Sequence, residues 1–401
     1  GQAGDISLMS ISPDGTRLAT SGRDDVIRVW DLASFQDPAQ KLNEGIGSFE
    51  QYAISPDGAQ IASRNIAGEL DIRDFETGEM IASLGSRLGS YISGLQYSPN
   101  GFHLASIDTY GRVTIWNMFN GKRVKTFGSA IKSADPVMDF SADGALLAVG
   151  GSDDSVMVWN VEAGKVEYTL PKSEYGNDEV SFNHNGTLLM TRDGIVSGSG
   201  LQLWDAKTGS PLGEWDSGDH YYELTFGIRF NPVDDSIAIG YQGGDLMIMD
   251  PYTKDEILRF KAHEGPVSDL NYSPDGALLV TVSDDRLIRV WDASTGEQMG
   301  SLSSDGREFM TARFSSDGSM LISTDTDGTI EFWDTRTRGR QSFDLQSATR
   351  LRQELKPVVK GWIKDADGDV KEVQRRFEAE SANRSPEEQV ALRNLILNQL
   401  R

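Results

Sequence analysis

The stretch from Ser12 to Asp31 reads "SPDGTRLATSGRDDVIRVWD". The stretch from Ser273 to Asp292 reads "SPDGALLVTVSDDRLIRVWD" and aligns with the first without a gap. Two such copies far apart in one chain indicate a repeated structural unit, so the residues between them are expected to carry further copies.

A four-residue phrase marks these copies and returns in phase at eight places. It reads "SPDG" at Ser12, Ser55 and Ser273, "SPNG" at Ser98, "SADG" at Ser141, "NHNG" at Asn183, "NPVD" at Asn231 and "SSDG" at Ser315. Ser, Pro, Asp and Gly suit successive positions of a type I turn, because Pro presets φ and Gly closes the turn without strain. A short apolar segment such as "LATS" or "LLVTV" follows each turn and predicts a strand.

Each unit continues with a second turn and a strand that ends in a Trp-Asp pair or its counterpart. The eight pairs are Trp30-Asp31, Arg73-Asp74, Trp116-Asn117, Trp159-Asn160, Trp204-Asp205, Met249-Asp250, Trp291-Asp292 and Trp333-Asp334. A third turn, often Thr-Gly, and a fourth strand such as "VKTF" or "EILRF" complete the unit. The repeat therefore predicts four antiparallel strands per unit.

These residues resemble the WD-repeat family, which is named for the Trp-Asp pair, and the resemblance covers Asp5 to Leu345. It implies that each unit is a four-stranded blade and that the blades close around an axis as a β-propeller. The predicted fold class is all-β: an eight-bladed WD-repeat β-propeller with a short C-terminal helical extension.

Each predicted blade is contiguous in sequence, so the ring would close where blade one packs on blade eight. The segment "GRQSFDL" (Gly339–Leu345) would supply the last strand of blade eight. The abrupt start predicts a domain cut from a longer polypeptide. The propeller is expected over residues 1–345, with blades near 5–47, 48–90, 91–133, 134–174, 175–221, 222–262, 263–305 and 306–345.

The resemblance also implies a buried hydrogen-bonded set in each blade, made of a His, a Ser or Thr, an Asp and the Trp. Satisfied partners make burial of the carboxylate tolerable. Blade seven matches fully, and three other blades match in part; the residues are His263, Thr281, Asp285 and Trp291 in blade seven, Thr20, Asp24 and Trp30 in blade one, Ser323, Asp327 and Trp333 in blade eight, and Asp153 and Trp159 in blade four. Arg73 and Met249 replace the Trp in blades two and six, which are expected to be the least rigid.

Composition excludes several classes of function. The net charge of −23 argues against a nucleic-acid partner, and the absence of Cys excludes disulfides and a thiolate nucleophile. No apolar stretch is long enough to span a membrane and no signal pattern opens the chain, which favours a cytoplasmic protein. The recurrent acidic pairs, such as Asp284-Asp285, fit turn chemistry better than catalysis or a metal, so no metal and no cofactor are expected.

Residues 346–401 predict helices. Leu351, Leu355, Val358 and Trp362 form one apolar stripe, and Ser385-Pro386-Glu387-Glu388 opens another helix near the end of the chain. The segment "DADGD" (Asp365–Asp369) resembles the start of a calcium loop but has Val370 and Arg376 where Gly and Glu are required, so a turn and a helix cap are preferred. These helices are expected to pack on the propeller or on another chain.

The predicted function is a non-catalytic scaffold for protein–protein interaction, within a larger regulatory or signalling protein. The partner is a protein or peptide of unknown identity. The alternative is a propeller enzyme with a site at the ring axis, which requires convergent His, Arg and acidic groups. Three of the four His have structural places, and only His220 is ambiguous.

A binding face is predicted where the period slips. Blade five has 21 residues from Asn183 to Trp204 where the other blades have 18, and the next interval is also longer than its counterparts. The additions fall in "RDGIVSGSG" (Arg192–Gly200) and "DSGDHYYELTF" (Asp216–Phe226), which should project from one face. Aromatic and Arg side chains on loops are common interface anchors. The proposed surface residues are Tyr175, Arg192, His220, Tyr221, Tyr222 and Tyr241. The alternative is that these rings cover blade six, which lacks its Trp.

Overall fold

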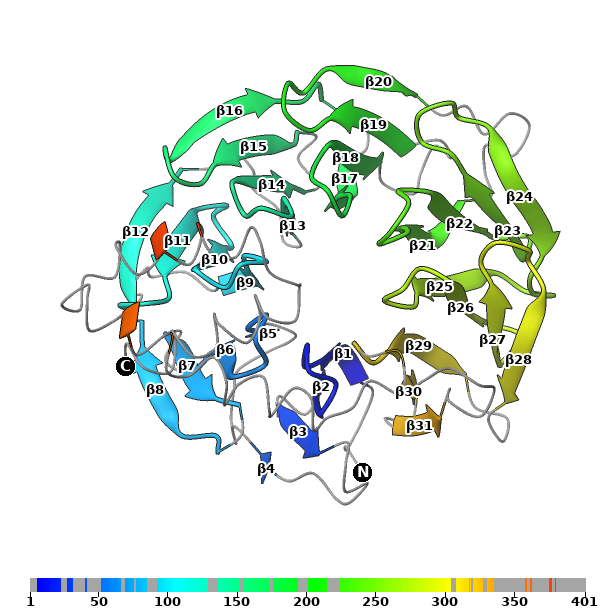
Figure 1. Cartoon of the computed structure of the whole chain (residues 1–401), viewed down its shortest axis with the longest axis horizontal. Helices are drawn as coiled ribbons and strands as arrows, with labels where there is room; N and C mark the ends of the chain where they lie inside the picture. The colour runs from blue at the N-terminus through cyan, green and yellow to red at the C-terminus, as the bar shows by residue number, and fades with distance from the viewer. Residues whose placement is uncertain are drawn as a thin grey trace.

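The structure is a computed structural model in which eight β-sheets surround a common axis (Figure 1). It describes residues 6–22, 27–31, 40–41, 52–65, 69–75, 77–84, 92–128, 136–151, 155–172, 176–193, 201–214, 224–303, 308–316, 318, 320–326, 330–334, 358, 361–362, 375–376 and 379. Consecutive strands pair antiparallel within each sheet, so the chain passes from the inner strand of each sheet to its outer edge.

The first four sheets follow one another along the chain, each with four strands. Their strands are β1 (Ile6–Ile11), β2 (Arg17–Gly22), β3 (Arg28–Asp31) and β4 (Gln40–Lys41); β5 (Tyr52–Ile54), β6 (Gln60–Arg64), β7 (Leu70–Asp74) and β8 (Met80–Ser83); β9 (Ile92–Tyr97), β10 (His103–Asp108), β11 (Val113–Asn117) and β12 (Lys122–Phe127); and β13 (Val137–Phe140), β14 (Leu146–Gly150), β15 (Met157–Asn160) and β16 (Lys165–Thr169).

The second half of the ring repeats the pattern until the last sheet, which has three described strands. The strands are β17 (Asn177–Phe182), β18 (Leu188–Asp193), β19 (Leu201–Asp205) and β20 (Pro211–Glu214); β21 (Leu224–Phe230), β22 (Ile237–Tyr241), β23 (Asp245–Met249) and β24 (Glu256–Lys261); β25 (Val267–Tyr272), β26 (Leu278–Ser283), β27 (Leu287–Asp292) and β28 (Gln298–Ser303); and β29 (Phe309–Phe314), β30 (Met320–Asp325) and β31 (Ile330–Asp334).

The repeated phrase forms the turn between the first two strands of each blade. In blade seven the Ser273 hydroxyl donates to Asp275 Oδ1 (2.6 Å) and accepts from Leu278 N (2.9 Å). Asp275 Oδ1 also accepts from Ala277 N (3.1 Å), and Gly276 has a positive φ of 69°. A short polar residue at the first and third places and Gly at the fourth therefore satisfy the backbone of a tight turn.

Antiparallel order places the connections of every blade on two opposite faces of the ring. We call the face with the first-to-second and third-to-fourth turns the turn face. The opposite face, with the second-to-third turns and the links between blades, is the insertion face. This geometry follows from the strand order alone.

The hydrophobic core lies between the blades. Buried apolar side chains form one cluster for each pair of neighbouring sheets around the ring. The last cluster joins Ile322 of β30 to Met9 and Leu18 of the first sheet. Beside it, the Ser316 hydroxyl donates to Ser12 O (2.9 Å). The ring therefore closes by packing of the eighth sheet on blade one.

Two parts of the predicted fold class need correction. The structure shows seven complete four-stranded blades where eight were predicted, and a three-stranded sheet, β29–β31, takes the eighth place. The predicted last strand, Gly339–Leu345, lies outside the described residues. The helical extension over residues 346–401 is not established, because no continuous helix is defined there, although the six residues described in this segment, 358, 361–362, 375–376 and 379, have helical backbone.

Gly244 is the turn glycine on which the following blade depends. Its φ is 89°, and a β-carbon there would lie 2.1 Å from His263 O, a backbone atom that cannot move aside cheaply. We expect Gly244→Ala to lower the free energy of unfolding by about 2 kcal/mol or more. Gly300→Ala is the matched control, since a β-carbon at Gly300 meets nothing within 4 Å. Urea unfolding of both variants tests this, and equal midpoints would contradict it.

Candidate functional site

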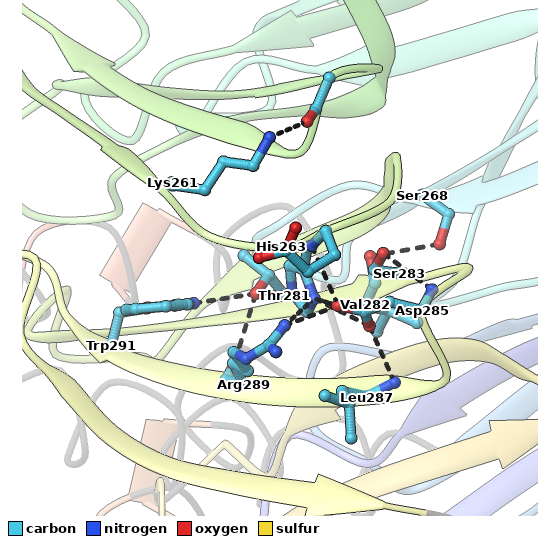
Figure 2. A network of polar contacts seen from close by, with 12 residues as sticks. Lys261, His263, Ser268, Thr281, Val282, Ser283, Asp285, Leu287, Arg289 and Trp291 are labelled. Carbon is cyan, nitrogen blue, oxygen red and sulfur yellow. Dashed lines mark hydrogen bonds and ion pairs between the residues drawn. The ribbon is translucent and has the colours of Figure 1, made fainter.

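The structure brings together the four side chains predicted for blade seven (Figure 2). Trp291 Nε1 donates to Thr281 Oγ1 (2.9 Å), and Thr281 Oγ1 lies 2.7 Å from His263 Nε2. His263 Nδ1 lies 2.9 Å from Asp285 Oδ2, and Arg289 Nη1 donates to the same oxygen (2.8 Å). A continuous chain of donors results if neutral His263 carries its proton on Nδ1 and Thr281 donates to Nε2. The set ties two strands, β26 and β27, the turn between them and the incoming link into one unit.

Burial explains the charge states in this set. Burial lowers the pKa of His263, and the neighbouring Asp285 only partly opposes the shift. Burial alone would raise the pKa of Asp285, but hydrogen bonds from Arg289 and His263 outweigh it and hold the pKa below its ordinary value. At neutral pH the set therefore contains a neutral imidazole and a charged carboxylate, which suits a structural role.

Other blades keep the Trp and hydroxyl part of the set. Trp30 Nε1 donates to Thr20 Oγ1 (2.9 Å) in blade one. The same bond, which we did not predict from the sequence, occurs in blades three and five, where it joins Trp116 to Ser106 (3.0 Å) and Trp204 to Thr191 (3.0 Å). The signal was available, because a hydroxyl residue eight positions after the start of the phrase marks each of these blades.

The remaining predicted members of the set are placed only in part. Asp24, Asp153 and Asp327 lie outside the described residues, as does the side chain of Trp333. In blade four, Val149 replaces the hydroxyl residue, and Trp159 Nε1 has no partner within the described part of the chain. The Trp159 ring instead stacks on Phe127 of blade three, with centroids 4.5 Å apart.

Blades two and six fill the Trp place in different ways. Arg73 Nη1 donates to Gly78 O (3.1 Å), and its Nη2 lies 3.6 Å from Asp71. In blade six, Met249 and Ile239 replace both the Trp and the hydroxyl residue, and both are fully buried in one cluster. Blade six therefore exchanges a hydrogen bond for apolar packing. Its predicted lower rigidity stays a prediction.

Arg192 was predicted to lie in the added loop, and this prediction was wrong. It belongs to β18, pairs with Glu179 of β17 in the sheet and is only 8% exposed. Its Nε lies 3.5 Å from Glu179 Oε2, and Glu179 Oε1 also accepts from Arg229 of blade six. One carboxylate shared between two guanidinium groups makes burial of Arg192 tolerable. Arg192 therefore supports the base of the loop.

Tyr241 is also excluded as an exposed anchor. It ends β22 at 1% exposure, and the Arg259 guanidinium lies 5.1 Å from the centre of its ring. Its side chain belongs to the apolar cluster between blades five and six. This burial agrees with the alternative in which aromatic rings fill blade six, at least for Tyr241.

Tyr175, His220, Tyr221 and Tyr222 lie outside the described residues. The strand ends that bracket the two added segments are described. β18 ends at Asp193 before β19 begins at Leu201, and β20 ends at Glu214 before β21 begins at Leu224. Both connections start from the insertion face at adjacent blades, because each joins strand ends of that face.

The inner strands of blades three, four and five share a second polar contact. Asp139 of β13 accepts from Gln96 Nε2 of β9 (2.9 Å) and from Phe182 N of β17 (2.7 Å). Burial raises the pKa of Asp139 to about 6, although both hydrogen bonds oppose the shift, and the nearby Glu179 raises it further. One carboxyl group thus joins three blades and titrates close to neutral pH.

Two kinds of feature are absent from the described residues. No group of three or more His, Asp or Glu side chains there is placed to hold a metal ion. No helix there is long and apolar enough to cross a membrane.

Comparison with known proteins agrees with the fold and the motif. The family model described as "WD domain, G-beta repeat" matches residues 1–31, 121–160, 254–292 and 296–334. Among solved structures, Chaetomium thermophilum Sqt1 bound to the N-terminus of the ribosomal protein L10 has a TM-score of 0.68 at 16% identity, covering 84% of this chain and 98% of that one. The computationally designed Ika8 protein has a TM-score of 0.65 at 20% identity, covering 83% and 97%. The chain is a β-propeller, and four of its segments match the WD-repeat model.

Curated relatives match only short parts of the chain. COMPASS component SWD1 of Saccharomyces cerevisiae is 38% identical over 71 residues, which are 17% of this chain and 17% of that protein. WD repeat and SOCS box-containing protein 1 of Homo sapiens is 34% identical over 95 residues, with 19% and 23% covered. The match therefore spans less than a quarter of either relative.

The pKa of Asp139 predicts a pH dependence of stability. Because the pKa is about 6 in the folded chain and 3.8 for an unperturbed Asp side chain, folding favours the protonated carboxyl group. Stability from this group is full below about pH 4 and is lost as pH rises through about 6, by up to about 3 kcal/mol. Asp139→Asn removes this change. The free energy of unfolding, measured between about pH 4 and 7, should rise for the wild type relative to the variant as pH falls. Parallel pH curves for the two proteins would refute the assignment.

Proposed function

We propose that this propeller is a non-catalytic scaffold that binds a protein or peptide partner, as part of a larger regulatory protein. The observation that carries the proposal is the pair of added segments, residues 194–200 and 215–223, at neighbouring blades of one face. The described polar residues beside them form structural contacts within and between blades rather than a convergent catalytic group. Sqt1 was solved bound to the N-terminus of a ribosomal protein, and SWD1 is a component of COMPASS, which supports the kind of partner proposed.

The proposed contact residues are His220, Tyr221 and Tyr222, together with Tyr175 on the neighbouring link. Arg192 has a positioning role in this proposal, since its contact with Glu179 fixes the end of β18 from which the first added segment starts. Tyr and His side chains offer apolar area with a polar end, which suits a peptide interface.

We also propose that Gly339–Leu345 completes the eighth sheet and that residues 346–401 are helical and pack on the propeller. Trp362 supports the docking, because its side chain is large and only 9% of it is exposed. The excess of acidic residues in the ring and the slight excess of basic residues in this segment favour the same contact.

The insertion face is tested with the triple variant His220→Ala, Tyr221→Ala and Tyr222→Ala. Peptides are selected from a random display library on the immobilised full chain, and their affinities are measured by calorimetry. We expect a class of peptides that binds the variant at least about tenfold more weakly, a loss of about 1.4 kcal/mol. The thermal transition should stay in place.

Tyr110→Ala is the matched control, because Tyr110 is 62% exposed on the second-to-third turn of blade three, on the same face. It should leave this class unaffected. A triple variant that unfolds at lower temperature would instead support the packing interpretation. Unchanged affinity in a stable triple variant would reject the proposed face.

Docking of residues 346–401 is tested with Trp362→Ala. If Trp362 packs on the propeller, its truncation should lower the free energy of unfolding by about 3 kcal/mol, through lost apolar burial and the cavity left behind. Deletion of residues 346–401 should lower the melting temperature in the same way. A transition unchanged in both proteins would show that the segment does not stabilise the ring.

A further inference from the structure

Blade six departs from the repeat on the turn face, at two neighbouring turns. The third residue of the phrase is Val233, whereas the other seven copies have a turn-capping Asp or Asn, namely Asp14, Asp57, Asn100, Asp143, Asn185, Asp275 and Asp317. Tyr252 stands in the third-to-fourth turn, where the flanking blades have Lys207 and Ser294. Val233 is 56% exposed and Tyr252 is 58% exposed. Turn chemistry explains neither apolar side chain.

A buried carboxylate holds this part of the blade in place. Asp235 has a positive φ of 66°, a conformation that the other turns assign to Gly. Its carboxylate accepts hydrogen bonds from three side chains, Asn183 Nδ2 (2.8 Å), Asn185 Nδ2 (2.9 Å) and Tyr252 OH (3.1 Å), and His184 Nδ1 lies 2.8 Å from it. A strained residue held by several partners is a feature that clusters at functional sites.

The contact with Asp235 fixes one end of Tyr252 and leaves its ring exposed. An aromatic side chain held in one orientation loses little conformational freedom when a partner covers it. The same carboxylate joins blade six to blade five, because Asn183 and Asn185, which donate to Asp235, come from the turn of blade five. Exposure, orientation and rigid support therefore coincide at Tyr252.

Two further exposed apolar side chains stand on the fourth strands of blades five and six. Leu212 of β20 and Ile257 of β24 are also among the exposed large apolar residues. Gly213, next to Leu212, lies so close to Lys254 that a β-carbon there would be 2.1 Å from Nζ. The edge of blade five therefore lies beside the turn that carries Tyr252. We call Leu212, Val233, Tyr252 and Ile257 the blade-six patch.

Carboxylates surround the blade-six patch. Its turns carry Asp234, Asp250 and Asp255 besides the buried Asp235, against the base Lys254, and Glu256 at the start of β24 is paired with Arg259 (2.9 Å). Asp234, Asp255 and Glu256 are exposed. An apolar centre with a negative rim complements a segment with an apolar side chain and flanking positive charges.

We propose that the blade-six patch is a second docking surface, which binds a cationic segment of a partner protein. An apolar side chain of that segment covers Val233 and Tyr252, and flanking Lys or Arg side chains meet the carboxylates. This surface lies on the face opposite to the added segments, so it is independent of the interface proposed above.

The test replaces the two central residues by those of the equivalent places in blade seven. The double variant Val233→Asp and Tyr252→Ser keeps the other contacts of Asp235 and removes the apolar centre. Val124→Ser with Val166→Ser is the matched control, because both valines are exposed on the outer strands of blades three and four. The probes are peptides selected from a random display library on the full chain, with affinities measured by fluorescence anisotropy.

We expect one selected class to carry positive charge beside an aliphatic or aromatic residue. Its affinity should fall at least about tenfold for the double variant and stay within about twofold for the control. It should also weaken as NaCl is raised from about 50 to about 500 mM, since exposed charges are screened. Peptides of this class should bind the His220, Tyr221 and Tyr222 triple variant normally, which separates this surface from the insertion face.

Hydrogen exchange of the wild-type chain keeps the test decisive if the double variant is unstable. Bound peptide should protect residues 231–236 and 250–257. Protection confined to other blades would overturn the proposal. So would a selection that yields no cationic class, or cationic peptides that bind a folded double variant as tightly as the wild type.

Discussion

Every blade of this ring is apolar on both faces, and the rest of the structure depends on that constraint. In β14, Leu147 and Val149 pack toward blade three, whereas Ala148, between them, packs toward blade five. A single sheet of this kind cannot bury both faces alone, because alternate side chains point to opposite sides. A linear stack would leave one face exposed at each end. Closure removes those ends, and the packing of Ile322 against Met9 and Leu18 provides it without a covalent link or a shared strand in the described residues.

The same constraint explains why the blade motif tolerates loss. The Trp and hydroxyl pair secures the strand order in four described blades, yet Met249 and Ile239 replace it in blade six without exposing either position. A lost hydrogen bond forgoes about 1 kcal/mol, whereas an apolar face left open to water would cost more for each large side chain. The strand faces therefore accept different residues at these two places as long as the side chains stay buried.

The repeat made the strands predictable. The resemblance to WD repeats made the hydrogen-bonded set of blade seven predictable. The phrase, its spacing and the Trp place are local signals, so the turns and most strand positions follow from them. Arg192 lies nine positions after the start of the phrase, like Val282 of β26, so the repeat itself places it in a strand and its assignment to the loop overlooked that register. Its contact with Glu179, which Arg229 shares, comes from another strand and leaves no mark on the repeat. Tyr241 was misassigned because Arg259 and the cluster of two blades enclose it. The bridge at Asp139 joins three blades and leaves no mark on the repeat.

Blade six shows how a change in one blade is balanced by its neighbours. With Met249 and Ile239 in place, no Trp ties its third strand to its second by a side-chain hydrogen bond. Polar contacts also join blade six to blade five. Glu179 pairs with Arg229 between the inner strands, and Asn183 and Asn185 donate to Asp235 on the turn face. These contacts hold blade six to blade five, and its own turns remain capped. Asp234 Oδ1 accepts from Ser236 N in the first turn, and Asp250 Oδ1 accepts from Tyr252 N in the turn between the third and fourth strands. Val233 is possible because Asp234, the next residue, supplies the cap that the third residue of the phrase supplies in other blades. Tyr252 stands where the flanking blades have Lys207 and Ser294, a place that does not require a capping side chain.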